Sequence, residues 1–184
     1  MVMTTSIINV KNSPCAGIQV HETTCTREDF MVLLAPIKKY LYNFIRKSLN
    51  YSAETDDIFQ ETILKGFRYF NTYDREKDFK TWIFTIAHNL MKDSYAYRQK
   101  NLSVSLEELG DVECERKEIS HEVQEIYTAA HVLAPRDREI FFLYYYNEFE
   151  VSEIAKVTGL SRPNIKFILH QARKNIKKRM EVRQ

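Results

Sequence analysis

The stretch that decides the fold runs from Glu150 to Lys178 and reads EVSEIAKVTGLSRPNIKFILHQARKNIKK. Its first part predicts a short amphipathic helix, because apolar residues recur at helical spacing at Val151, Ile154, Ala155 and Val157. Gly159 then supplies the permissive backbone that a sharp helix-ending turn needs. Ser161 can cap a second helix, and Pro163 is tolerated only in the first turn of one. The stretch therefore predicts two helices joined by a tight turn.

The second of these helices has two different sides. One side is apolar and carries Ile165, Ile168, Leu169, Ala172 and Ile176. The other side is polar and mostly basic, with Lys166, His170, Gln171, Arg173, Lys174, Lys177 and Lys178. Two helices, a turn with glycine and a basic outer face indicate a helix-turn-helix, whose second helix would enter a DNA major groove.

Positive charge is concentrated in this part of the chain. From Ser161 to the end there are eight basic residues and one acidic residue, a net charge of +7 within a chain whose total is +2. The preceding part therefore sums to −5. An αα-hairpin inside an ordinary bundle is the alternative, but a bundle has no need for so local an excess of cations. The distribution favours contact with DNA phosphates.

Composition limits the class of protein. The chain has 184 residues, 44% hydrophobic and 12% aromatic, which is enough for one large or two small folded domains. Gly and Pro number only four each, which favours long helices over tight β-turns. We find no apolar run of membrane-spanning length and no signal-peptide pattern, so we expect a cytoplasmic protein without membrane insertion.

The cysteines Cys15, Cys25 and Cys114 are few, odd in number and without CxxC spacing, so we expect reduced thiols rather than disulfides. Cys15, His21 and Cys25 could supply three zinc ligands, but no fourth ligand lies nearby. We therefore expect no metal and no cofactor.

The first half of the chain is expected to be a separate helical domain. Residues 1–26 read as a poorly ordered leader, and residues 27–100 show helical periodicity, with Pro36 expected to kink or break the first helix near its middle. In the next helix, which runs to about Phe70, three polar residues cluster in the first turns: Asp57, Gln60 and Glu61. The acidic ones could simply complement the helix dipole, and a binding role needs further support.

A charged segment from Asn71 to Lys80 reads as an exposed loop that leads into a helix from Thr81 to about Arg98. The end of that helix interleaves tyrosines with cations, a combination that can stack on unpaired bases, although half-buried tyrosines at a helix end would look the same. Residues 101–118 are acidic and weakly periodic, which predicts a flexible linker to a second helical domain at 119–184. The predicted fold class is thus all-α, with two small domains.

The motif from Phe79 to Asp93, FxxWIxxIAxNxxxD, resembles the central motif of the extracytoplasmic-function RNA polymerase sigma factors. Upstream, DDIFQETILKGF, from Asp56 to Phe67, is similar to the polymerase-binding helix of that family. Downstream, the run from Pro135 to Lys178 resembles its C-terminal DNA-binding domain. The resemblance covers roughly Phe30 to Met180, in the family's order.

This resemblance implies a dissociable subunit of bacterial RNA polymerase that recognises the −10 and −35 promoter elements and helps to melt the promoter. The implied partners are core RNA polymerase (the clamp helices of its largest subunit and the flap of the second), promoter DNA and an anti-sigma factor. The residues that would bind the clamp helices are Asp57, Gln60, Glu61 and Phe67. Those that would read and open the −10 element are Tyr73, Lys80, Trp82, Asn89, Lys92, Tyr95 and Arg98.

The same resemblance implies a set of residues for the −35 duplex: Ser161, Arg162, Asn164, Lys166, Phe167, His170, Gln171, Arg173 and Lys174. The sequence departs from the family at Ile168 and Gln171, where arginine is frequent, and at Glu150, where a serine or threonine cap is frequent. The promoter sequence therefore does not carry over. Phe167 is apolar on a face expected to be polar; it would touch a thymine methyl group or pack sideways.

Two other functions fit the sequence less well. A stand-alone helix-turn-helix regulator with a sensing or dimerising N-terminal domain explains residues 150–178 equally well, but it leaves the Trp82 motif and the Gln60–Glu61 pair without a role. An enzyme is disfavoured, because the sequence has no glycine-rich phosphate loop, no HExxH and no GxSxG. No catalytic residue is predicted.

Overall fold

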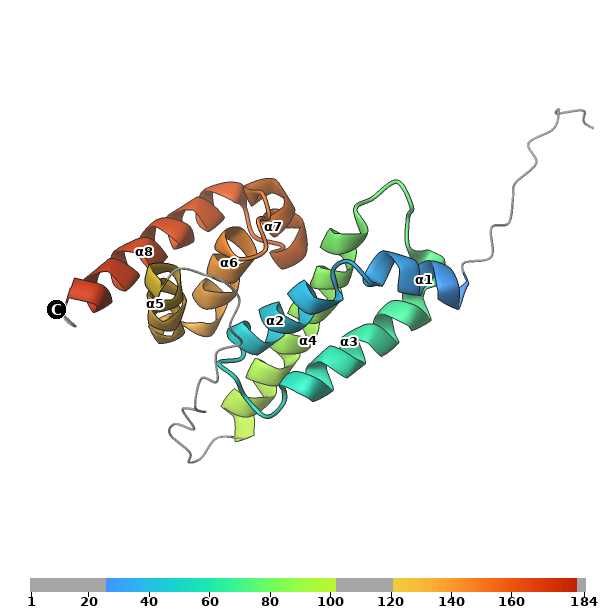
Figure 1. Cartoon of the computed structure of the whole chain (residues 1–184), viewed down its shortest axis with the longest axis horizontal. Coiled ribbons are helices and arrows are strands. Elements are labelled where there is room, and N and C mark those ends of the chain that lie inside the picture. The colour runs from blue at the N-terminus through green and yellow to red at the C-terminus, as the bar shows by residue number, and fades with distance from the viewer. Residues whose placement is uncertain (1–25, 102–120, 182–184) are drawn as a thin grey trace, which may run out of the picture.

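The structure is a computed structural model that describes residues 26–101 and 121–181. Within these ranges it contains eight α-helices and two short 3-10 helices, with no strand (Figure 1). The predicted all-α class is confirmed. The predicted leader and almost all of the predicted acidic linker lie outside the described residues.

The first half of the chain forms a four-helix layer. Its helices are α1 (Arg27–Leu34), α2 (Lys38–Ser48), α3 (Thr55–Tyr69) and α4 (Phe79–Asn101), with a 3-10 turn η1 (Phe70–Thr72) between the last two. Pro36 lies between α1 and α2 and separates them, as its missing N–H and fixed φ predict.

An aromatic cluster closes one end of this half. Phe30 packs edge-on against Phe70 and Phe79, with ring centroids 5.3 and 5.8 Å apart. Gly66 lets α3 approach here, because a Cβ at this position would lie 2.5 Å from Cδ1 of Ile83 on α4. The segment 71–80, which the sequence predicts to be an exposed loop, is in part organised around this cluster, since Tyr73 and Phe79 are buried.

The second half contains α5 (His121–Ala129), the 3-10 turn η2 (Ala130–Val132), α6 (Pro135–Tyr145), α7 (Val151–Thr158) and α8 (Arg162–Glu181). Helices α7 and α8 form the predicted helix-turn-helix. Gly159 ends α7 with φ 72° in the left-handed region, as the turn requires. Glu150, the unusual cap residue, forms a capping box: its backbone N–H donates to the carboxylate of Glu153 over 2.7 Å.

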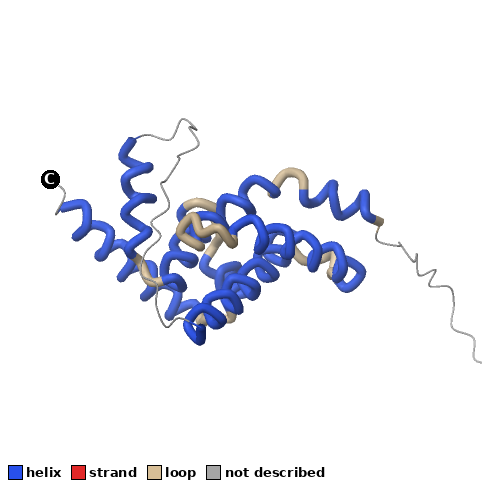
Figure 2. Tube along the Cα trace, turned by 90° about the horizontal axis from the view of Figure 1, so that it is seen from below, coloured by secondary structure: helices blue, strands red, loops and turns tan. Residues whose placement is uncertain are grey.

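The two halves pack directly against each other. Helices α2 and α4 of the first half contact α6 and α7 of the second (Figure 1). The buried apolar side chains of both halves form one continuous cluster. The view turned by 90° shows the same close packing of the helical segments (Figure 2). We call this contact, together with the loop 146–150 between α6 and α7, the seam. The described helices include none that is long and apolar enough to cross a membrane.

Candidate nucleic-acid interface

Helix α8 buries one side and leaves the other open. Its buried residues are the predicted ones, Ile165, Ile168, Leu169, Ala172 and Ile176. Eight of the nine residues predicted for the −35 duplex are exposed, and only Gln171 is half-buried. Helical geometry therefore gives α8 an outward face centred on Pro163, Phe167, His170 and Lys174, with Lys166 and Arg173 along one edge and Asn164, Gln171 and Lys178 along the other.

The cations of this outward face are available to a ligand. Lys166, Lys174 and Lys178 make no hydrogen bond or ion pair with any described residue. Arg173 donates one hydrogen bond, from Nη1 to the hydroxyl of Tyr145 over 3.3 Å, and this pair is exposed. A convex helix with free cations on its outward face can neutralise phosphates along a groove.

The residues predicted for the −10 element lie on α4, apart from Tyr73, which precedes it. Some of them are exposed and others are buried or bound to neighbouring residues. Asn89 and Lys92 are exposed, and Trp82 is half-buried beside the ring of Tyr73 at 5.1 Å. Tyr73 itself is buried, and burial raises the pKa of its hydroxyl. Its hydroxyl donates to the backbone carbonyl of Lys77, which fixes the segment before α4.

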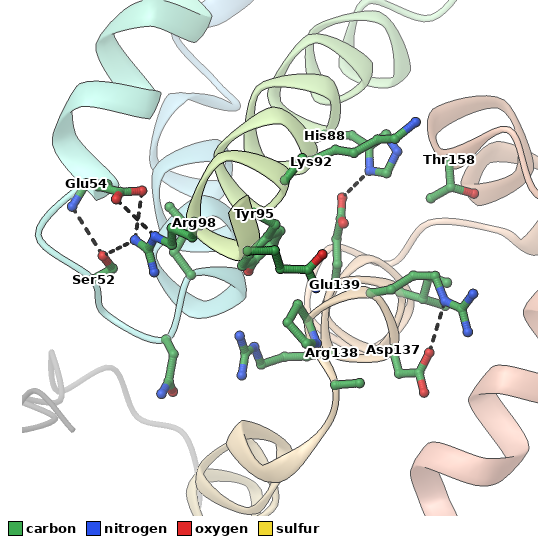
Figure 3. A pocket seen from close by; sticks show the side chains of 18 of the residues that line it. Ser52, Glu54, His88, Lys92, Tyr95, Arg98, Asp137, Arg138, Glu139 and Thr158 are labelled. Atoms are coloured by element: carbon green, nitrogen blue, oxygen red, sulfur yellow. Dashed lines mark hydrogen bonds and ion pairs between the residues drawn. The ribbon is translucent and has the colours of Figure 1, made fainter. Parts of the chain in front are cut away.

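The other residues of this set have structural partners. Arg98 binds Glu54 in an ion pair of 2.7 Å and donates to the hydroxyl of Ser52 over 2.6 Å (Figure 3). The hydrogen bond from Arg98 lowers the pKa of the Glu54 carboxyl. The hydroxyl of Tyr95 donates to the backbone carbonyl of Ser48 over 2.6 Å, and burial raises its pKa. These side chains tie α4 to the α2–α3 connection.

Lys80 lies in the seam. Its amino group donates to the backbone carbonyl of Asn147 over 2.6 Å and lies 4.4 Å from the ring centroid of Phe149. Phe149 is 2% exposed and packs against the fully buried ring of Phe84 at 5.0 Å. Part of the α4 surface is therefore covered by the loop 146–150 in this arrangement.

Polar contacts continue the seam beside this aromatic pair. Nδ1 of His88 on α4 lies 2.6 Å from a carboxylate oxygen of Glu139 on α6, and both side chains are largely buried (Figure 3). The guanidinium of Arg138 donates to the backbone carbonyl of Ser48 over 2.9 Å. Sequence reasoning missed Phe149, Arg138 and Glu139, because contacts between distant parts of a chain leave no periodic signal.

An open pocket of about 1320 Å³ lies where the halves meet. It is lined from the first half by residues such as Tyr51, Lys92 and Arg98, and from the second by the start of α6 and by Leu160 (Figure 3). No group of three or more metal-ligating side chains occurs in the described ranges.

Helix α3 presents a third surface, away from the seam. Asp57 and Gln60 are exposed, Glu61 is half-buried beside Lys65 at 3.9 Å, and Phe67 is 46% exposed. Leu64, 59% exposed, shares their side of the helix, because it follows Gln60 and Glu61 by four and three residues. Sequence reasoning missed Leu64, although the helical period from Gln60 was the signal that could have found it.

Two families match the chain, in the order in which the two halves occur. Residues 33–101 match the family described as Sigma-70 region 2. Residues 123–176 match the family described as Sigma-70, region 4. The first range covers the end of α1 and all of α2–α4, and the second covers most of α5–α8.

Curated relatives cover most of the chain. The ECF RNA polymerase sigma factor SigM of Bacillus subtilis is 26% identical over 143 residues, which cover 74% of this chain and 86% of SigM. The ECF RNA polymerase sigma factor SigX of the same organism is 25% identical over 165 residues, covering 84% of this chain and 85% of SigX.

Two solved structures share the fold. The sigma factor RpoE of Bartonella quintana, in complex with the anti-sigma factor NepR, superposes with a TM-score of 0.74 at 21% identity, covering 85% of this chain and 99% of that one. CnrH, in complex with the cytosolic domain of CnrY, superposes with a TM-score of 0.64 at 21% identity, covering 86% and 92%. The arrangement of both halves is thus one that solved proteins also adopt.

Proposed function

Because this chain belongs to the extracytoplasmic-function RNA polymerase sigma factors, we propose that it reads promoters through two separate surfaces, one on α4 and one on α8, while α3 holds it on core RNA polymerase. The observation that carries this division is the outward face of α8, where cations lie free beside exposed polar side chains. The chain contributes recognition and DNA opening, and the catalysis belongs to the polymerase.

The outward face of α8 would bind the −35 element as duplex DNA. Lys166 and Lys174 would contact phosphates, and Gln171 has the amide that pairs with the adenine edge in the major groove. A recognition helix reads bases mainly with its N-terminal residues, and here those are Arg162, Asn164 and Phe167.

The exposed side of α4 would bind the −10 element. Asn89 offers an amide to a base that has left the stack, and Lys92 offers a charge to the displaced strand. Lys80 would contribute only after its hydrogen bond to the carbonyl of Asn147 breaks. Binding of the −10 element through Lys80 therefore requires the seam to open at this point, and the roles of Tyr73, Tyr95 and Arg98 would be to position α4.

The surface of α3 would dock on the clamp helices of the largest polymerase subunit. Leu64 and Phe67 supply an exposed apolar contact, and Asp57, Gln60 and Glu61 surround it with polar groups. An apolar centre with a polar rim is the usual composition of a specific protein interface. The flap of the second subunit would contact the α5–α8 half.

An anti-sigma factor is a further proposed partner. Two proteins of similar structure were solved with bound partners, RpoE with the anti-sigma factor NepR and CnrH with the cytosolic domain of CnrY. A partner of this kind would compete with core polymerase or keep the seam closed.

A pull-down with core polymerase tests the proposed function. The full chain should co-purify with core enzyme and direct it to initiate at specific promoters in a run-off assay. The triple substitution Asp57→Ala, Gln60→Ala and Glu61→Ala should abolish co-purification, whereas Lys166→Ala should not, because Lys166 lies on the DNA-facing helix. Full binding by the triple variant would show that the docking surface is elsewhere.

A stand-alone helix-turn-helix regulator would also bind duplex DNA through α8, but it would not co-purify with core polymerase. The match of residues 33–101 to Sigma-70 region 2 does not favour it.

A further inference from the structure

Phe167 occupies an unusual position on α8. It is 62% exposed, and it is the only large apolar side chain on this helix that is exposed to this degree within the described residues. A single exposed phenylalanine needs no explanation by itself, because scattered apolar side chains are normal on protein surfaces. Its place on the helix is what matters.

That place is the middle of the outward face. At 3.6 residues per turn, Phe167 lies about 200° around the helix from the buried Ile165, nearly opposite the apolar stripe. It does not pack sideways against α7 or α6, since most of its surface is open. It is also the sixth residue of α8, within the first two turns, where a recognition helix approaches base edges.

The side chains around Phe167 indicate that its binding partner is DNA rather than an apolar protein surface. Lys166 precedes it, His170 and Lys174 follow it on the same face, and Asn164 lies one turn before. An apolar protein partner would leave these polar and basic groups without water or counter-charge. In the major groove, by contrast, phosphates flank the groove, and thymine presents one apolar group, its 5-methyl.

We propose that Phe167 determines specificity in the −35 element by contacting the methyl group of a thymine. This assignment rests on the proposed function of α8 as the −35-reading helix. The aromatic ring would be shielded from water by an apolar group only when a thymine faces it, whereas cytosine would place a polar amino group near the ring. The preference for thymine therefore depends mainly on its 5-methyl group.

The experiment uses the full chain assembled with core polymerase. The wild-type holoenzyme first selects a −35 sequence from a promoter library with randomised upstream positions. Each thymine in the selected element is then replaced singly by deoxyuridine, which removes the 5-methyl group and leaves base pairing unchanged. Binding is measured for the wild type, Phe167→Ala, Phe167→Leu and Asn175→Ala, an exposed residue of α8 outside the proposed contact set.

We expect wild type and Asn175→Ala to bind about three- to five-fold more weakly at one or two thymine positions when the methyl group is removed. Phe167→Ala should bind the thymine promoter more weakly and be indifferent to deoxyuridine. Phe167→Leu, which keeps an apolar side chain, should retain part of the methyl dependence.

Two outcomes would overturn the assignment while leaving the proposed function in place: wild type indifferent to the methyl group at every thymine, or Phe167→Ala as sensitive to its removal as wild type. A wild-type holoenzyme that enriches no −35 sequence at all would instead contradict the proposed function, and the assignment would fall with it.

Discussion

In the seam, the amino group of Lys80 and the guanidinium of Arg138 donate hydrogen bonds to backbone carbonyl oxygens. On the outward face of α8, by contrast, Lys166 and Lys178 are exposed to solvent. Both regions place basic side chains near an aromatic ring, Phe149 in the seam and Phe167 on α8. In the seam the cations donate to backbone carbonyls and the aromatic rings pack together, and these contacts hold two halves of the chain together. On α8 the two lysines have no such partner among the described residues, which leaves them for a ligand. The contrast teaches that residue type alone does not mark a nucleic-acid surface.

The largest expected effect tests whether the seam contributes to stability. Phe149→Ala removes a buried ring that packs on Phe84, so we expect the free energy of unfolding in urea to fall by about 3–5 kcal/mol. Phe167→Ala is the matched control, because it removes an equal but exposed ring and should change stability by less than about 0.5 kcal/mol. Equal small effects of both would mean that the halves separate in solution.

A somewhat smaller effect concerns pH. Burial, and then the charges of Arg138 and Lys47, lower the pKa of His131 from 6.5 to about 4. Because the folded pKa lies below the unfolded one, the unfolded chain binds more protons between these values, and stability is lost as pH falls through this range. We expect a decrease of about 2–3 kcal/mol between about pH 7 and about pH 4.5, measured by urea unfolding.

His131→Gln should remove most of that decrease, whereas His170→Gln should not, because His170 is exposed on α8. An identical pH profile for His131→Gln and wild type would show that other groups cause the acid sensitivity.

The third prediction concerns Lys80, which belongs to the seam and is proposed to contact the −10 element. Lys80→Met keeps the apolar stem but removes the hydrogen bond to the carbonyl of Asn147, so the stability of the free chain should fall by about 1–2 kcal/mol. Lys92→Met, which changes an exposed residue of the same helix, should have almost no effect on stability. Promoter opening by the holoenzyme is then compared for the two variants. This comparison separates the role of Lys80 in the seam from its proposed contact with the −10 element.

The smallest effect on stability is expected on the outward face of α8. Lys166→Ala combined with Lys174→Ala should change the unfolding free energy by less than about 0.5 kcal/mol. The same pair should reduce the slope of log affinity against log salt by up to about one unit for each phosphate that is no longer neutralised. An unchanged salt slope would mean that these lysines do not face DNA.

The helices themselves were predictable from local chemistry. Pro36 and Gly159 each end a helix as the sequence predicts, and the apolar stripe of α8 is buried residue by residue. Periodicity and capping act within a few residues, so they can be read from the chain directly.

The seam was not predictable in the same way. Phe149 is a single aromatic residue between two glutamates, and nothing local indicates that it meets Phe84. Tyr73 lies in a charged segment without an apolar period, and only tertiary packing buries it. Eight of the nine −35 residues are exposed, and the −10 set is divided between free and partnered side chains. The roles of both sets remain predictions.

The hydrogen bond between Lys80 and the loop 146–150 has a consequence for affinity. If only the form with that bond broken binds the −10 element, the measured dissociation constant is the intrinsic one divided by the fraction of molecules in that form. A fraction of about one in a hundred would weaken apparent binding about a hundred-fold. Any partner that favours the open form would restore this affinity without touching DNA.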